Sequence, residues 1–183
     1  MNKIKTIFDR DWGGSRKVVN KPLIDLSILK DAVATEKLNG TNVRVTVRNR
    51  IAVRVEKRKN PTKEQKAAGI EEPWYIDANI NDPQDKWIFD GLSNTNLELP
   101  DGEWSGELVG PNIQGNPLEL EKNIIVFFSL GQAPVFNDVP INYEGLKNWL
   151  PKQKSKYGDD CHIEGIVWHL SNGDMYKIKV KDF

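Results

Sequence analysis

The chain has 183 residues, of which 38% are hydrophobic and 28% are charged, with 26 basic and 26 acidic side chains. This length favours a single domain spanning residues 1–183, and the composition excludes a disordered or fibrous protein. The balanced charge excludes attraction of nucleic acid through a global positive field, so any such attraction must come from a local patch.

Three features of the sequence bear on where the protein resides. No apolar run approaches the ~20 residues needed to cross a bilayer, and no hydrophobic block of the secretory kind follows the first residues. Cys161 is the single cysteine, so no disulfide can form within the chain. We therefore expect a cytoplasmic protein without a membrane partner.

The first clear element in the sequence is a hairpin over residues 43–55. Apolar residues alternate with polar residues on both sides of Asn49-Arg50, which we predict to form the turn. Because alternate side chains of a strand share a face, one face of the hairpin is expected to pack in the core. That face would carry Val43, Val45, Val47, Ile51, Val53 and Val55. The outer face would carry Arg44, Arg48 and Arg54.

The same hairpin begins a locally basic stretch. Between Arg44 and Lys66 the chain has nine basic residues and two acidic residues, a local charge of +7. A solvated hairpin face is the more common meaning of such a pattern. A surface that binds the phosphates of RNA is the alternative.

The rest of the chain is expected to form short strands and short helices. The sequence predicts helices at residues 62–68 and 143–150, the second of them stopped by Pro151. Asn172-Gly173 is typical of a two-residue hairpin turn. This order of elements predicts an α+β fold with antiparallel sheets. Strands are expected at residues 103–109, 123–130, 164–169 and 175–180.

Two common motifs are excluded because the sequence lacks residues that they require. Residues 110–115 have the glycine spacing of a phosphate-binding P-loop, but residues 116–117 are Asn-Pro where Lys and Ser or Thr are required. The soft metal ligands Cys161, His162 and His169 are too few for a structural zinc site. A P-loop nucleoside triphosphatase and a zinc-stabilised domain are therefore excluded.

The remaining residues that could take part in catalysis or ligand binding are charged groups near strand ends. Lys37 follows an apolar strand, on a turn that Gly40 permits. Lys177 and Lys179 lie on one face of a later strand. With a two-residue turn before that strand, Glu164 shares their face. This arrangement is either a site for a metal and a phosphate or a surface salt bridge.

Five segments in this order resemble the motifs of the covalent nucleotidyltransferases, the superfamily of DNA ligases, RNA ligases and capping enzymes. The first is similar to the motif around the nucleotide-accepting lysine. Residues 106–116 resemble RNA ligases of the RNA ligase 2 type. Residues 6–11 and 177–183 resemble a family of small ATP-dependent RNA ligases whose vertebrate member is called RNA ligase 1. The five segments are residues 36–42, 57–58, 106–107, 164–167 and 177–179.

The resemblance implies one nucleotidyltransferase domain, without a C-terminal oligonucleotide-binding barrel, that acts as an ATP-dependent RNA ligase. AMP would pass from ATP to Lys37, giving a lysyl-AMP intermediate, and then to an RNA 5′-phosphate. An RNA 3′-hydroxyl would then seal the ends. The implied cofactors are ATP and Mg²⁺ or Mn²⁺, and the implied partner is RNA with 5′-phosphate and 3′-hydroxyl ends, as in RNA repair. No obligate protein partner is implied.

The resemblance also implies roles for individual residues. Lys37, Lys177 and Lys179 would be catalytic, and Glu164 would hold the metal. Adenine would lie between the ring of Phe127 and the side chain of Val167. The residues expected to bind the nucleotide are Glu36, Asn42, Arg58, Glu107, Phe127 and Val167.

Two details depart from a simple match to the superfamily. Asn39 stands where the superfamily usually has Asp, so no acid–base role is expected at this position. Glu164 and Val167 have opposite parity along a strand, and a bulge at Gly165 would bring both to the same face.

Two alternative functions stay open. The first is another covalent nucleotidyltransferase, a guanylyltransferase or a DNA ligase core; the expected absence of the barrel disfavours it. The second is a non-catalytic module that binds nucleic acid. The presence of Lys37, Glu107, Glu164, Lys177 and Lys179 disfavours this second alternative.

Overall fold

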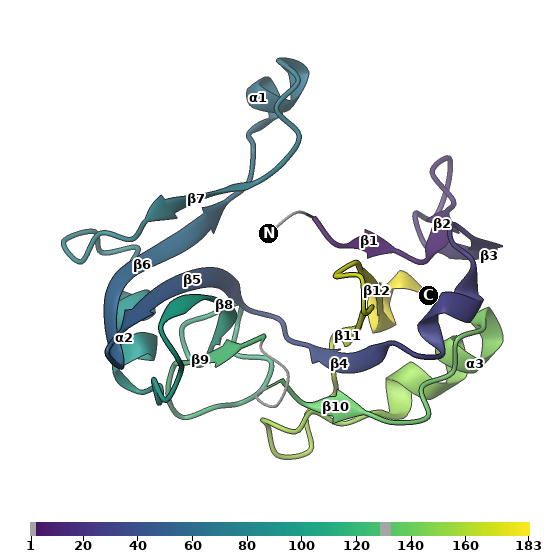
Figure 1. Cartoon of the computed structure of the whole chain (residues 1–183). Coiled ribbons are helices and arrows are strands. Elements are labelled where there is room, and N and C mark those ends of the chain that lie inside the picture. Colours follow the sequence, from purple (N-terminus) through teal and green to yellow (C-terminus); the bar gives the residue numbers. More distant parts are fainter. Residues whose placement is uncertain (1–2, 129–132) are drawn as a thin grey trace. The chain divides into compact units, whose positions relative to one another are not determined.

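The computed structural model describes residues 3–128 and 133–183. The chain forms two compact units, each of which is assembled from separate segments (Figure 1). Unit 1 comprises Met1–Lys3 and Asn39–Ala133, and unit 2 comprises Ile4–Leu38 and Pro134–Phe183. The expectation of one domain over residues 1–183 stays a prediction, and each unit is described by itself.

Unit 1 is built on a five-stranded antiparallel sheet with strand order β7-β6-β5-β8-β9 (Figure 1). Its core lies on one face of the sheet, where the valines of β5 pack with Phe127 and with Ile88 of α2. The strand expected over residues 123–130 is present as β9, and residues 129–130 of that expectation lie outside the described part of the chain. The elements are β5 (Thr41–Arg48), β6 (Ile51–Lys59), α1 (Lys63–Ala67), β7 (Trp74–Asp77), α2 (Lys86–Ser93), β8 (Gly102–Val109) and β9 (Ile124–Phe127).

The β5–β6 hairpin confirms the predicted turn but corrects one half of the predicted core. Asn49 and Arg50 both have positive φ, at 50° and 61°, as a two-residue hairpin turn requires. The register then shifts between Thr46 and Val47, so that Ala52 pairs with Val47. Ile51 pairs with Arg48 and shares its outward face, and Val53 lies at the bulge; their exposed fractions are 63% and 58%. The prediction that both pack in the core was wrong, because the two-residue turn places Ile51 opposite Arg48 and strict alternation fails at Val53.

Unit 2 contains a second five-stranded sheet, with order β1-β12-β11-β4-β10, and the separate hairpin β2–β3. β1 is parallel to β12, and the other pairs are antiparallel. One face of the sheet packs on α3 and on the hairpin, through Ile166, Trp168, Ile178, Phe8 and Leu146. The strands are β1 (Lys5–Thr6), β2 (Phe8–Arg10), β3 (Val18–Pro22), β4 (Val33–Lys37), β10 (Val135–Phe136), β11 (Gly165–His169) and β12 (Met175–Lys179). The helices are η1 (Leu26–Leu29), α3 (Tyr143–Trp149), η2 (Leu150–Lys152) and η3 (Val180–Asp182).

The turn between β11 and β12 is one residue longer than predicted. Leu170 pairs with Asp174, its amide donating to the Asp174 carbonyl at 2.9 Å, and Gly173 lies at φ 89°. This leaves a three-residue loop with a left-handed last residue, a common hairpin connection. The register therefore differs by one from the two-residue expectation, and Val167 lies opposite Lys177. Gly165 lies opposite Lys179.

The α+β class with mainly antiparallel sheets and short helices is confirmed. Across residues 3–128 and 133–183, no helix is long and apolar enough to cross a membrane.

Gly165 gives a direct test of the sheet in unit 2. A Cβ atom at this position would lie 2.1 Å from the carbonyl oxygen of Ile178 and 2.7 Å from Cα of Lys179. Since both neighbours are backbone atoms, the strands must separate to accept a methyl group. We expect Gly165→Ala to lower the free energy of unfolding by roughly 1–3 kcal/mol or more, measured by urea denaturation. Gly13→Ala is the control, because no heavy atom lies within 4 Å of the added Cβ. Equal stability of the two variants would contradict the close approach.

Candidate functional site

Lys37 is the last residue of β4, and the register of unit 2 fixes its neighbours. Gly165 lies opposite Lys37 on one side and opposite Lys179 on the other, so the three residues form one row across β4, β11 and β12. Directly paired residues of antiparallel strands share a face. The absence of a side chain on Gly165 leaves the space between the two lysines to the side chain of Glu164.

Glu164 forms ion pairs with both lysines. Its Oε2 accepts from Nζ of Lys37 at 2.6 Å, and its Oε1 accepts from Nζ of Lys179 at 2.5 Å. The side chain of Glu164 is 12% exposed, and those of both lysines are 19% exposed. Burial raises the pKa of the Glu164 carboxyl, but the charges and hydrogen bonds of Lys37 and Lys179 outweigh burial and hold this pKa below its ordinary value. The carboxylate therefore stays ionised at neutral pH.

A second row on the same face holds Val167 and Lys177. Val167 lies opposite Thr35 on β4 and opposite Lys177 on β12. Val167, Lys177, Lys37 and Lys179 thus share one face without the bulge at Gly165 that the sequence suggested. The parity conflict is resolved because β11 begins at Gly165, so that Glu164 precedes the strand and reaches this face through its side chain.

Thr35 and His169 extend this face, and sequence reasoning missed both. Oγ1 of Thr35 lies 2.9 Å from Nε2 of His169. Burial lowers the pKa of His169 below its ordinary value, so the ring is neutral at pH 7. The available signal was the parity of Thr35 with Lys37 on one strand.

Glu36 does not join the group around Lys37. It lies opposite Ile166, on the face of the sheet that packs in the core, and its side chain is buried. Oε2 of Glu36 accepts from the amide of Lys156 at 3.1 Å. Burial raises the pKa of this carboxyl above its ordinary value, although hydrogen bonds with Ser155 and the Lys156 amide act in the opposite direction. The assignment of the Glu36 side chain to the nucleotide is therefore corrected: adjacent residues of a strand point to opposite faces.

Unit 1 carries a row of polar residues on the face opposite its core. Asn42 lies opposite Glu107, and Arg58 lies opposite Tyr75. The hydroxyl of Tyr75 donates to Oδ1 of Asn42 at 2.6 Å, and Oε1 of Glu107 accepts from the amide of Gly40 at 3.2 Å. Nε of Arg58 is buried and has no hydrogen-bond partner within the described part of the chain. The predicted residues Asn42, Arg58 and Glu107 thus share one face, together with Tyr75, which the sequence analysis missed.

The placement of Phe127 at the base of the nucleotide is corrected by the sheet. Phe127 lies opposite Gly106, is fully buried, and packs in the core with the valines of β5. Its ring therefore has no free face for adenine. The amide of Phe128 donates to the carbonyl of Ser105 at 2.9 Å, which puts Phe128 at the register position of the polar face. Phe128 is only partly buried.

Some basic residues of the hairpin are paired with carboxylates of their own unit. Arg44 donates two hydrogen bonds to the buried Glu56, at 2.6 and 2.8 Å. Arg54 pairs with Asp77 at 2.7 Å, and Lys57 pairs with a buried aspartate, Asp85, at 2.5 Å. Glu56 is already counted in the local charge of +7, and Asp77 and Asp85 offset two of these seven charges. At Arg44 and Arg54 this pairing favours a solvated and internally paired face over an RNA surface.

The donor set around Glu164 fits a hard divalent cation only in part. Carboxylate oxygen is the ligand type that Mg²⁺ prefers, and proteins often supply only one or two carboxylates beside substrate phosphates. Glu164 provides one such group. Among residues 3–128 and 133–183, no cluster of three or more His, Cys, Asp or Glu side chains could hold a metal alone. Phosphate oxygens and water would have to complete the shell.

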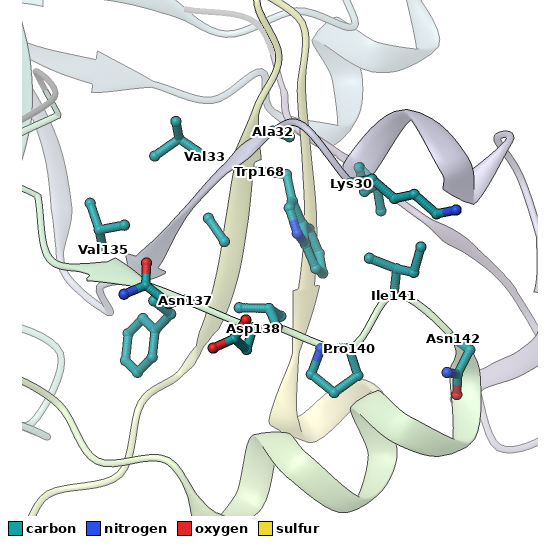
Figure 2. Close-up of a pocket in the computed structure, with 14 residues that line it drawn as sticks. Lys30, Ala32, Val33, Val135, Asn137, Asp138, Pro140, Ile141, Asn142 and Trp168 are labelled. Carbon is teal, nitrogen blue, oxygen red and sulfur yellow. The ribbon is translucent and has the colours of Figure 1, made fainter.

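Unit 2 also contains a cavity of about 920 Å³ that is separate from these residues. Figure 2 shows it beside the start of β4, with Trp168 and Ile141 among its walls. Ala34 and Trp168 belong to the core face of the sheet, opposite Lys37. None of the predicted site residues lines this cavity.

The two buried glutamates should affect stability in opposite directions. The folded-state pKa of Glu164 is lowered, so its contribution to stability is present at neutral pH and is lost as the pH falls below about 4.5, its ordinary value. The folded-state pKa of Glu36 is raised, so its ionised form costs stability at neutral pH. We expect Glu164→Gln to destabilise the protein at pH 7 by roughly 1–3 kcal/mol, with a smaller difference from wild type at pH 3.5.

Glu36→Gln is the matched variant, and it should leave stability at pH 7 unchanged or raised. Urea denaturation at both pH values measures these differences. A Glu164→Gln penalty that does not shrink in acid would contradict the ion-paired state of this carboxylate.

Comparison with known proteins bears on this arrangement of residues. Residues 94–183, just under half of the chain, match the family model described as RNA ligase 1. No curated protein sequence matches the chain.

Several solved structures share the fold. A variant of the Naegleria gruberi RNA ligase with AMP and Mn has a TM-score of 0.50 and 15% identity, and the match covers 85% of this chain and 52% of that one. A second variant, with ATP and Mn, has a TM-score of 0.50 and 14% identity over 98% of this chain and 60% of that one. A third variant, also with ATP and Mn, has a TM-score of 0.50 and 15% identity, and the match covers 100% of this chain and 61% of that one.

The chain therefore spans between about half and two thirds of the length of these ligases. At this identity the likeness concerns the fold, and the family match concerns the C-terminal half, which contains Glu107, Glu164, Lys177 and Lys179. The resemblance expected from the sequence is confirmed: the chain has the fold of an RNA ligase-type nucleotidyltransferase, and its C-terminal half matches the RNA ligase 1 family.

Proposed function

We propose that this protein is an ATP-dependent RNA ligase that acts through a lysyl-AMP intermediate on Lys37. The observation that carries the proposal is the contact of Glu164 with both Lys37 and Lys179, on a face that also holds Lys177 and Val167. The RNA ligase 1 match over residues 94–183 supports the class of enzyme. The Naegleria gruberi RNA ligase, solved with ATP and Mn, supports ATP and a divalent metal as cofactors.

In the proposed first step, Nζ of Lys37 attacks the α-phosphorus of ATP. A P–N bond forms, the bond to the bridging oxygen breaks, and pyrophosphate leaves. Lys37 must first separate from Glu164 and lose a proton, because only the neutral amine is a nucleophile. A divalent cation on Glu164 would supply the positive charge that replaces the lysines at this carboxylate.

Lys177 and Lys179 would stabilise the charge that develops on the phosphoryl oxygens. Fixed cations of this kind act without reorganisation during the reaction, which is the main source of catalysis in phosphoryl transfer. Their positions on one strand face, two residues apart, suit two neighbouring oxygens. Val167 lies in the row next to Lys37 and offers an apolar surface to a base.

The nucleotidyltransferase resemblance, taken for unit 1 by itself, implies that its polar row would bind the sugar of a nucleotide. Carboxylate, amide and guanidinium groups are suited to hydroxyl groups, and Glu107, Asn42 and Arg58 provide one of each. The buried Nε of Arg58 lacks a partner within the described residues, and a ligand oxygen would satisfy it.

In the later steps, AMP passes from Lys37 to the 5′-phosphate of an RNA. The P–N bond breaks as the RNA phosphate oxygen attacks the phosphorus of AMP. The 3′-hydroxyl of the second RNA end then attacks the RNA phosphorus, and AMP leaves. RNA repair in the cytoplasm is the setting that we propose for this reaction.

Intact-mass measurement tests the class of reaction and the nucleotide together. The protein is mixed with ATP and Mg²⁺ or Mn²⁺, and 5′-phosphorylated RNA is then added. We expect a mass increase of one AMP that RNA removes. An adduct formed from GTP alone would support a guanylyltransferase, and discharge by nicked DNA but not by RNA would support a DNA ligase core.

Substitution of Lys37 tests the nucleophile. We expect both Lys37→Ala and Lys37→Arg to abolish the AMP adduct, because neither provides a primary amine. Lys37→Arg retains a cation for Glu164 and serves as the control for folding, checked by thermal denaturation. An adduct of undiminished yield in either folded variant would place the nucleophile elsewhere.

Substitution of the two phenylalanines tests the corrected strand. Phe127→Ala should lower the free energy of unfolding by about 3–5 kcal/mol, because it empties a buried site. Phe128→Ala should cost less stability but weaken ATP binding by roughly tenfold, since stacking on a base is worth about 1–3 kcal/mol. Calorimetric titration with ATP measures the second effect. If Phe127→Ala folds and weakens ATP binding more than Phe128→Ala does, the assignment of the two faces is wrong.

A further inference from the structure

Residues 6–11 and 177–183 are the segments that resemble the small RNA ligase family. They contact each other in unit 2. Nη2 of Arg10 on β2 donates to Oδ1 of Asp182 in η3 at 2.6 Å. The C-terminal end, drawn in yellow, lies beside β2 and β3 in Figure 1. Nζ of Lys17 also donates to the carbonyl of Lys181, at 2.9 Å. Nothing in the proposed reaction uses this contact directly.

Asp182 is a buried carboxylate with two distinct partners. Its residue is 3% exposed. Oδ1 accepts from Arg10, and Oδ2 accepts from the backbone amide of Lys179 at 3.0 Å. Among the described residues, Arg10 is the one cation within salt-bridge distance of Asp182. A buried carboxylate is costly without a charged partner, so Arg10 fixes the orientation in which Asp182 can bind the Lys179 amide.

The Lys179 amide lies at the end of the sheet, where the Asp182 carboxylate accepts its hydrogen bond. Lys179 is the last residue of β12, and η3 begins at the next residue. The amide of Val180 donates to the carbonyl of Glu164 at 2.9 Å. Glu164 and Lys179 therefore lie at the same end of the β11–β12 ladder, where strand ends would otherwise fray. The Asp182 carboxylate ties the backbone at this end.

We propose that Arg10 and Asp182 are positioning residues for Lys179, and through it for Glu164 and Lys37. The chain of contacts runs from Arg10 to Asp182, to the backbone of Lys179, and from the Lys179 side chain to Glu164 and Lys37. Each hydrogen bond in it measures 3.0 Å or less. Arg10 and Asp182 do not touch the reacting atoms. The proposal rests on the proposed function for its catalytic consequence, but not for its structural one.

The structural consequence is testable without any activity. Hydrogen exchange, read by mass spectrometry on peptides covering residues 177–183, should accelerate in Arg10→Ala and in Asp182→Ala. Lys21→Ala is the matched control, because it removes the exposed Asp9–Lys21 pair of the same hairpin and leaves Asp182 intact. We expect exchange in the control to equal that of wild type. Unchanged exchange in Asp182→Ala would overturn the proposal, whatever the protein catalyses.

The catalytic consequence is tested by a double-mutant cycle on the rate of adduct formation. Loss of a supporting residue of this kind costs about 10–100-fold in activity in well-studied sites, and we expect a loss of that size in Arg10→Ala with ATP affinity changed less than threefold. In a Lys179→Ala background, Arg10→Ala should have an effect of less than about twofold, because its target is gone. Arg10→Lys should restore part of the rate.

The outcomes separate this proposal from the proposed function. If Arg10→Ala slows adduct formation equally with and without Lys179, Arg10 stabilises the fold and does not position Lys179. If wild type forms no adduct but the exchange result holds, the proposed function fails and the positioning contact stands. If Arg10→Ala does not fold, Asp182→Asn, which keeps an acceptor for the Lys179 amide, carries the same cycle.

Discussion

One carboxylate shared by two ammonium groups is the charged centre of the polar face in unit 2. Glu164 pairs with Lys37 and Lys179 at 2.6 and 2.5 Å, and all three side chains are mostly buried. Removing charged groups from water is costly, and this cost is met only when partners are held in good geometry. The glycine between the lysines, the register of three strands and the ties at the strand end all serve that geometry.

The two sheets use the same division between their faces. In each unit one face packs in an apolar core, and the other carries the polar residues that the nucleotidyltransferase resemblance singled out. This division explains why neighbouring residues have different roles. Lys37 faces the charged row while Glu36 is buried behind it, and Phe127 packs in the core while Phe128 occupies the register position of the polar face.

Strand alternation and turn residues in the sequence predicted the fold class, and the motif resemblance grouped Lys37, Glu164 and Lys179. Sequence reasoning failed where one residue changes the register. The third residue of the loop before β12 shifts the register of that strand by one residue, and the bulge at Val53 interrupts the alternation of β6. Local charge counts also could not identify Asp77 as the partner of Arg54, because the two residues are far apart in the sequence.

The proposed ligase reaction depends on Lys37 as the acceptor of AMP, and peptide mapping of the adduct tests this role most directly. The protein is incubated with ATP and Mn²⁺ at low temperature, digested, and sequenced by tandem mass spectrometry. The account predicts AMP on Nζ of Lys37 in the peptide that contains residues 36–42, and its loss after 5′-phosphorylated RNA is added. AMP on Lys177 or Lys179, with Lys37 unmodified, would contradict the account.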